Sequence, residues 1–288
     1  VCTWTGLHTE MILAAAESGV KAINAEKPMA PTWGEAKKQH EVCTQRGVQL
    51  TFSHQRRFAL PFYRAKQLLD EGAIGRPLHI EGYCPNLFDW GTHWFDMFCF
   101  FNNDEPAEWV MGQIDATGSR QVFGVPVEGA GLSWIRWKNG LQGLIVTGHA
   151  GHFGASNLIR VIGTQGLLEV GEGYGLRLLQ EGHPWQTPDI QAVPFYEEWQ
   201  RIAGWLKAQG PEVRGDIATI LYILDSIQCL KTSQEPLLSS RRALQATELI
   251  FATYESSRRR AKVVLPLEVE DSAFLTMLQE DLLPVTSH

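Results

Sequence analysis

The sequence has no long apolar run and few cysteines. No apolar stretch approaches the roughly 20 residues that a membrane-spanning helix requires, and no secretory signal peptide opens the chain. The five cysteines are odd in number and form no Cys-x-x-Cys pair. Such usage indicates reduced thiols rather than a disulfide framework. The sequence therefore predicts a cytoplasmic protein with no membrane partner.

Positive charge is scarce as well. The chain has 25 lysines and arginines against 32 aspartates and glutamates, so its net charge is -7 and its pI is about 5.7. Nucleic-acid phosphates require a basic surface, and the dense basic cluster Arg258-Arg259-Arg260 is instead expected in the last turn of a helix, where it complements the helix dipole. Nucleic acid is therefore not an expected partner.

What the chain does contain is an alternation of strand and helix patterns in its first part. Three apolar runs predict buried strands and two periodic segments predict helices between them: Val1–Trp4, Thr9–Ser18, Val20–Ala25, Thr32–Arg46 and Val48–Ser53. This order is typical of a parallel sheet that binds ligands at the carboxyl ends of its strands. A complete dinucleotide-binding sheet begins with a glycine-rich turn, and none precedes Val1. We expect residues 1–56 to be the carboxyl-terminal remnant of a dinucleotide-binding domain.

A second pattern begins near Leu60. A helix and an alternating strand are followed by long alternating segments and then by three helical segments. The predicted elements are Pro61–Glu71, Leu78–Tyr83, Glu108–Ala116, Gly131–Lys138, Leu141–His149, Asn157–Thr164, Gly166–Val170, Phe195–Ala208, Asp216–Lys231 and Arg241–Arg258. The predicted fold class is α/β plus α+β: an incomplete parallel sheet, then a large, mostly antiparallel open sheet covered by helices on one face. We expect this second domain to span residues 57–266, with a tail at 267–288.

Two short motifs carry titratable groups suited to catalysis. Glu26-Lys27-Pro28 follows a predicted strand, and Asp89-Trp90-Gly91-Thr92-His93 opens a predicted helix. A lysine, a carboxylate and an imidazole can share one substrate hydroxyl, as a dehydrogenase requires. Asp89 and His93 are four residues apart and would face the same side of a helix. A simpler interpretation also fits, in which Asp89 caps the helix and His93 is a half-buried imidazole.

These motifs, in their order, resemble the Gfo/Idh/MocA family of oxidoreductases from Val1 to about Pro266. The shared features are a small-residue loop with a histidine, a Glu-Lys-Pro strand end, an Arg-Phe pair and an Asp-x-Gly-x-His-x-x-Asp motif. The matching positions are Cys2-Thr3-Trp4-Thr5-Gly6-Leu7-His8, Glu26-Lys27-Pro28, Arg57-Phe58, and Asp89, Gly91, His93 and Asp96. The resemblance implies that the first domain is of the Rossmann type and that the Lys27-Pro28 bond is cis.

The resemblance also implies an activity. Family members transfer hydride between NAD or NADP and a hydroxyl or carbonyl of a sugar, cyclitol or related polyol, and pair as homodimers or homotetramers through the sheet of the second domain. The residues that the family pattern makes catalytic are Lys27, Asp89 and His93. Those that it places at the cofactor are Thr5, His8, Glu26 and Lys27, and it favours Arg57 as a substrate contact. Tyr83 and Trp90 are expected at the substrate for a different reason, because aromatic faces suit the C–H surfaces of sugars. No metal is expected, because His149 and His152, three apart on a predicted strand, would point to opposite faces.

The phosphate-binding glycine loop is absent from this sequence, and from this we expect an amino-terminally truncated chain with impaired activity. Two alternatives remain open. In the first, the chain is not a dehydrogenase but a catalytically inactive scaffold that uses its sheet for oligomer contacts. In the second, it is an NAD-dependent glycosidase of the same family. A glycosidase would release a sugar without net formation of NADH.

Overall fold

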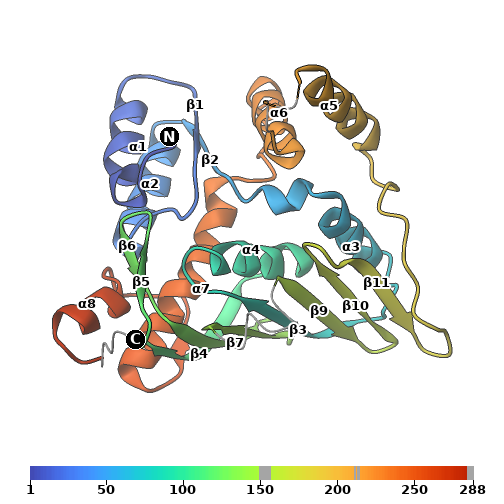
Figure 1. Cartoon of the computed structure of the whole chain (residues 1–288). Coiled ribbons are helices and arrows are strands. Elements are labelled where there is room, and N and C mark those ends of the chain that lie inside the picture. Colours follow the sequence, from blue (N-terminus) through green and yellow to red (C-terminus); the bar gives the residue numbers. More distant parts are fainter. Residues whose placement is uncertain (149–156, 211, 213–214, 284–288) are drawn as a thin grey trace.

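The computed structural model describes residues 1–148, 157–210, 212 and 215–283. His149 and His152 lie outside these residues. Figure 1 shows a small amino-terminal layer of helices and strands beside a broad sheet, with helices stacked on one face of that sheet. The incomplete parallel sheet and the large, mostly antiparallel sheet that the sequence predicted are both present. That part of the prediction is confirmed.

The amino-terminal layer is built on two parallel strands. β1 (Ala22–Ala25) pairs with β2 (Gln49–Phe52), and the two are joined by α2 (Trp33–Gln45). The helix begins where predicted, because the hydroxyl of Thr32 accepts a hydrogen bond from the backbone N–H of Glu35 at 3.3 Å. A short 3-10 helix (Thr5–Leu7) leads into α1 (His8–Glu17).

The strand predicted at Val1–Trp4 is wrong as an element. Val1 donates from its amino terminus to the carbonyl of Asn24 at 2.6 Å, and its own carbonyl accepts from Glu26 at 2.9 Å. One residue therefore continues the pairing alongside β1. The chain then turns into the 3-10 helix, so the apolar pattern there packs a loop rather than a strand.

The broad sheet has eight strands in the described part of the chain, in the order β11-β10-β9-β3-β8-β7-β4-β12. Its strands are β3 (Pro77–Cys84), β4 (Ala107–Asp115), β7 (Ala130–Trp137), β8 (Gln142–Thr147), β9 (Leu158–Gly163), β10 (Gly166–Gly171), β11 (Gly175–Gln180) and β12 (Val263–Val264). Only β3 and β8 are parallel neighbours. The sequence prediction missed β11 and the separate hairpin of β5 (Arg120–Val122) and β6 (Val125–Val127).

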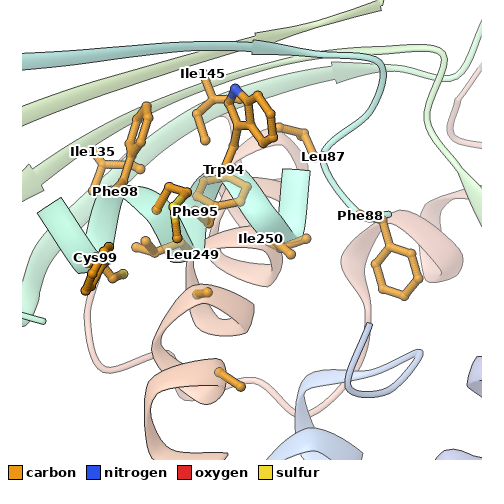
Figure 2. Close-up of a cluster of buried hydrophobic side chains, with 14 of the residues drawn as sticks. Leu87, Phe88, Trp94, Phe95, Phe98, Cys99, Ile135, Ile145, Leu249 and Ile250 are labelled. Carbon is orange, nitrogen blue, oxygen red and sulfur yellow. The ribbon is translucent and has the colours of Figure 1, made fainter. Parts of the chain in front are cut away.

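Helices cover one face of this sheet and form the core with it. The helices in contact with the sheet are α3 (Leu60–Asp70), α4 (Gly91–Phe101) and α7 (Ser240–Arg259). The helices α5 (Tyr196–Ala208) and α6 (Ile217–Thr232) pack against each other, α6 also contacts the 3-10 helix Gln55–Phe58, and α8 (Ala273–Gln279) packs on α7. Every residue of α4 is buried. Figure 2 shows its side chains Trp94, Phe95 and Phe98 between the strands and α7. Gly82 of β3 permits this approach, since a Cβ there would lie 2.6 Å from the ring of Trp94. The sheet therefore holds α4, and with it the start of the second motif, in a fixed place.

Candidate active site

Lys27 and Asp89 meet although they are far apart in the sequence. Lys27 lies just beyond the carboxyl end of β1, and its cis bond to Pro28 begins the next loop. Its Nζ donates to Oδ1 of Asp89 at 2.5 Å, and the two side chains are 18% and 10% exposed. The Lys27 ammonium also lies 5.4 Å from the ring of Phe123, at the tip of the β5–β6 hairpin. The ion pair is therefore only partly open to solvent, between the two sheets.

Asp89 is held by a turn that precedes α4. The side-chain oxygen of Asn86 accepts hydrogen bonds from the backbone of Asp89 at 2.7 Å and of Trp90 at 3.3 Å. The backbone N–H of Gly91 donates to the carbonyl of Asn86 at 2.8 Å, and a Cβ on Gly91 would come within 2.8 Å of that oxygen. This close approach explains the glycine in the motif. The alternative that Asp89 caps the helix is wrong, because no side chain caps α4 and Asp89 binds Lys27 instead.

His93 lies in the first turn of α4 and is buried. Its Nδ1 has no hydrogen-bond partner among the described residues. Burial, and then the positive charge of Arg56, hold the pKa of His93 well below its ordinary value of 6.5. His93 is therefore a neutral imidazole near pH 7, with a ring nitrogen available to a ligand.

A second histidine, which the sequence analysis missed, lies beside the first. The rings of His54 and His93 meet edge to face with centroids 5.7 Å apart. His54 is hydrogen-bonded to the hydroxyl of Thr92 at 3.0 Å, and its other ring nitrogen is 3.7 Å from Asp96. Burial lowers the pKa of His54 to about 4. The signal in the sequence was its place directly after a buried strand, where a parallel sheet collects ligand-facing side chains.

Arg57, predicted to bind substrate, is instead fully buried within the protein. Its guanidinium binds Asp96 through Nε and Nη2 at distances of 2.9 to 3.1 Å, and its Nη2 also binds Asp104 at 2.8 Å. All of its nitrogens are occupied by these two carboxylates. Arg57 therefore joins the segment before α3 to α4, and its contact with substrate remains a prediction.

His8, predicted to contact the cofactor, is also occupied. Its Nδ1 lies 2.9 Å from the carbonyl of Pro28 and its Nε2 lies 3.1 Å from the carbonyl of Thr3. The ring is 1% exposed. The imidazole therefore connects the loop after β1 to the first loop of the chain, and its contact with a cofactor remains a prediction.

Tyr83, predicted to bind substrate, points away from the site. Side chains alternate along β3, and Tyr83 shares a face with Glu81, whereas Gly82 faces Trp94 on the helix-covered side. Burial and Glu81 raise the pKa of the Tyr83 phenol, which places the two side chains near each other. A single residue in register decides which face of a strand a side chain occupies, and substrate contact by Tyr83 remains a prediction.

Three further residues were predicted to contact the cofactor or the substrate, namely Thr5, Glu26 and Trp90. Thr5 is buried in the short 3-10 helix, and Glu26 is half-buried at the end of β1. Trp90 is half-buried next to Asp89, and the guanidinium of Arg56 lies 5.4 Å from its ring. Their roles at a cofactor or substrate remain predictions. Among the described residues, no group of three or more His, Cys, Asp or Glu side chains is placed to hold a metal ion.

Glu128, also missed, supports the Asp89 turn from behind. It is fully buried, accepts a hydrogen bond from the backbone of Leu87, and accepts another from the phenol of Tyr254 on α7 at 2.6 Å. Burial raises the pKa of Glu128 to about 7. The stability of the Asp89 turn is therefore expected to depend on pH, through the protonation of this carboxyl.

The substitution Glu128→Gln, which removes the titratable carboxyl, tests this pH dependence. The folded-state pKa lies above the ordinary value, so the stability from this carboxyl is fully present below about pH 4.5 and is lost by about 3 kcal/mol as pH rises through about 7. Between about pH 5 and about pH 8 the wild type is expected to lose free energy of unfolding relative to Glu128→Gln, measured by urea denaturation. Equal pH dependence of the two proteins would contradict the buried, protonatable carboxyl.

Known proteins match this chain at the level of sequence. A family model for GFO_IDH_MocA, described as an oxidoreductase family with an NAD-binding Rossmann fold, matches residues 1–54. The scyllo-inositol 2-dehydrogenase (NAD(+)) of Bacillus subtilis is 27% identical over 185 residues, which are 59% of this chain and 54% of that protein. The chain therefore resembles members of the Gfo/Idh/MocA oxidoreductase family in sequence. It spans about half the length of this first relative.

Further Gfo/Idh/MocA-type matches extend over most of the chain. The D-xylose 1-dehydrogenase (NADP(+)) of Haloarcula marismortui is 24% identical over 292 residues, covering 92% of this chain and 73% of that protein. An inositol dehydrogenase homolog from Azotobacter vinelandii, solved with NADH and myo-inositol, superposes with a TM-score of 0.73 at 16% identity, covering 91% of this chain and 76% of that one. The family and fold predicted from the sequence are thereby confirmed.

Proposed function

We propose that this protein is an NAD(P)-dependent oxidoreductase that transfers hydride between a nicotinamide cofactor and a hydroxyl or carbonyl of a sugar, cyclitol or related polyol. The observation that carries the proposal is the Lys27–Asp89 ion pair at 2.5 Å, formed between the carboxyl end of β1 and the turn before α4. A neutral, unpartnered His93 lies in the same region. The names of two relatives, a scyllo-inositol 2-dehydrogenase and a D-xylose 1-dehydrogenase, support the substrate class.

The polar groups at the end of β1 fit the nicotinamide half of such a cofactor. The half-buried Glu26 and Lys27 and the neighbouring Thr5 lie where parallel strands present their ligands. When bound, the nicotinamide supplies an acceptor for the hydride that leaves the substrate carbon. The substrate panel described below, run with NAD and with NADP, decides which of the two cofactors the protein uses.

The chain's own residues handle the substrate oxygen and its proton. The Lys27 ammonium donates a hydrogen bond to that oxygen and stabilises negative charge as it develops, while Asp89 holds the ammonium in place. The neutral imidazole of His93 accepts the hydroxyl proton as the C–H bond breaks. Because the pKa of His93 is held well below 6.5, its base form persists at mildly acid pH.

The assembly and location of the protein also belong to this proposal. Large apolar side chains lie exposed on the broad sheet, including Met111, Leu132 and Trp134, and support homodimers or homotetramers through that face. The described cysteines are all free, which supports a cytoplasmic location. No helix in the described part of the chain is long and apolar enough to cross a membrane. We retain residues 1–56, 57–266 and 267–288 as the proposed domains and tail.

A substrate panel tests the function. Inositols, aldoses and glycosides are incubated with the protein and either NAD or NADP, and reduced nicotinamide is followed by absorbance while products are separated by chromatography. The expected result is an oxidised sugar or cyclitol in equal amount to the reduced cofactor. A released sugar without net reduced cofactor would favour the glycosidase. No turnover and no cofactor binding with any member of the panel would favour the scaffold.

A further inference from the structure

Arg56 is a buried cation with unused hydrogen-bond donors. It is 6% exposed, and its Nε and Nη1 have no partner among the described residues. Its Nη2 binds Oε1 of Glu172 at 2.6 Å. Buried guanidinium groups are normally paired through most of their donors, because each unpaired donor has lost its hydration. The Nε and Nη1 donors of Arg56 can therefore bind an acceptor that the described residues do not supply.

The surroundings place Arg56 at the active site. Its guanidinium lies 5.4 Å from the ring of Trp90 and 5.1 Å from that of Trp94, which fixes its plane. It is also close enough to His93 to affect the titration of that imidazole. Trp90 directly follows Asp89, so the free donors of Arg56 lie near the Lys27–Asp89 pair.

The existing partner of Arg56 is easily displaced. Glu172 lies in the turn between β10 and β11, and its side chain is 43% exposed against 8% for Arg56. An exposed carboxylate loses little when it returns to water. The other carboxylate that acts on Arg56, Asp216, is exposed and already caps α6 by accepting from Ala218 and Thr219. A bound anion can therefore replace Glu172 without leaving a buried charge behind.

We propose that Arg56 binds a carboxylate of the substrate, so that the preferred substrates are sugar acids such as uronates rather than neutral sugars. This inference rests on the proposed oxidoreductase function. Lys27 and Asp89 neutralise each other, so once Glu172 is displaced Arg56 contributes one positive charge, which matches one carboxylate better than a doubly charged phosphate. The planar guanidinium can also hold a planar carboxylate through two parallel hydrogen bonds.

The test compares matched ligands on the wild type, Arg56→Met and the control Arg177→Met. Arg177 is also paired to a glutamate, Glu169, but projects from β11 with 51% of its side chain exposed. Isothermal titration calorimetry measures D-glucuronate, D-glucose and D-glucose 6-phosphate, and kcat/KM is measured for those that react. Glucuronate is expected to bind the wild type and the control at least about tenfold more tightly than glucose, because a charge-assisted pair is added. Arg56→Met is expected to remove this preference, so that glucuronate binds the variant no more tightly than glucose does.

Other results separate this inference from the proposed function. Equal affinity for glucuronate and glucose, or a preference that survives Arg56→Met, overturns the carboxylate site. A stronger preference for glucose 6-phosphate also overturns it. Oxidation of neutral sugars without any glucuronate preference leaves the oxidoreductase function standing alone. An Arg56-dependent glucuronate preference without any reduced cofactor supports the carboxylate site and removes the oxidoreductase function.

Discussion

Replacing Lys27 by methionine is expected to lower kcat/KM for the alcohol substrate by about 100- to 10 000-fold. The ammonium is the group that the structure places against Asp89 at the carboxyl end of β1, at 2.5 Å, and methionine keeps the length of the side chain while removing its charge and donors. The loss should fall mainly on kcat, since the charge on the substrate oxygen develops during hydride transfer. Steady-state kinetics with the best substrate of the panel measure both parameters.

Lys37→Met is the matched control for Lys27. Lys37 also forms an ion pair at 2.5 Å, with Glu270, but it lies on α2 near the carboxyl-terminal part of the chain and away from Asp89. It should keep kcat/KM within about twofold, because exposed ion pairs contribute little. Thermal unfolding of both variants shows whether the fold is retained. A folded Lys27→Met variant with unchanged kcat would remove Lys27 from the mechanism.

The second large effect concerns stability. Arg57→Met is expected to lower the free energy of unfolding by about 3–5 kcal/mol, because it leaves the buried Asp96 and the partly buried Asp104 without their main cation. Asp96 also lies 3.7 Å from His54, whose ring contacts His93. Loss of Arg57 should therefore disturb the active site as well as the core. Urea denaturation at neutral pH measures the free energy.

Arg242→Met provides the comparison for Arg57. Arg242 binds the same Asp104 at 2.8 Å, but its side chain is 19% exposed against none for Arg57. Its removal should cost about 1 kcal/mol or less, because Asp104 keeps Arg57 and part of its hydration. The double change Arg57→Met with Asp96→Leu should recover part of the loss, since it removes both buried charges. If Arg57→Met lost no more than Arg242→Met, the buried cluster would not be a determinant of stability.

The site residues that the sequence identified correctly in position are those whose neighbours are local. Lys27 follows a short strand, and Asp89 and His93 flank a helix start, so patterns of a few residues place them. The partners of Arg57 and His8 and the face of β3 that Tyr83 occupies could not be predicted from the sequence, for a common reason. Each is decided by partners distant in the sequence or, for Tyr83, by which face of β3 packs against α4.

The sequence alone determined the alternation of parallel and antiparallel segments, the family, and the two motifs, because periodicity and motif order are local properties of the chain. Only the tertiary structure decided which charged groups are paired within the protein and which keep free hydrogen-bond donors. Burial and long-range pairing commit Arg57 to Asp96, leave donors of Arg56 free, and raise the pKa of Glu128 behind the Asp89 turn. Those outcomes depend on desolvation and on distances across the fold, and neither can be inferred from the spacing of residues along the chain.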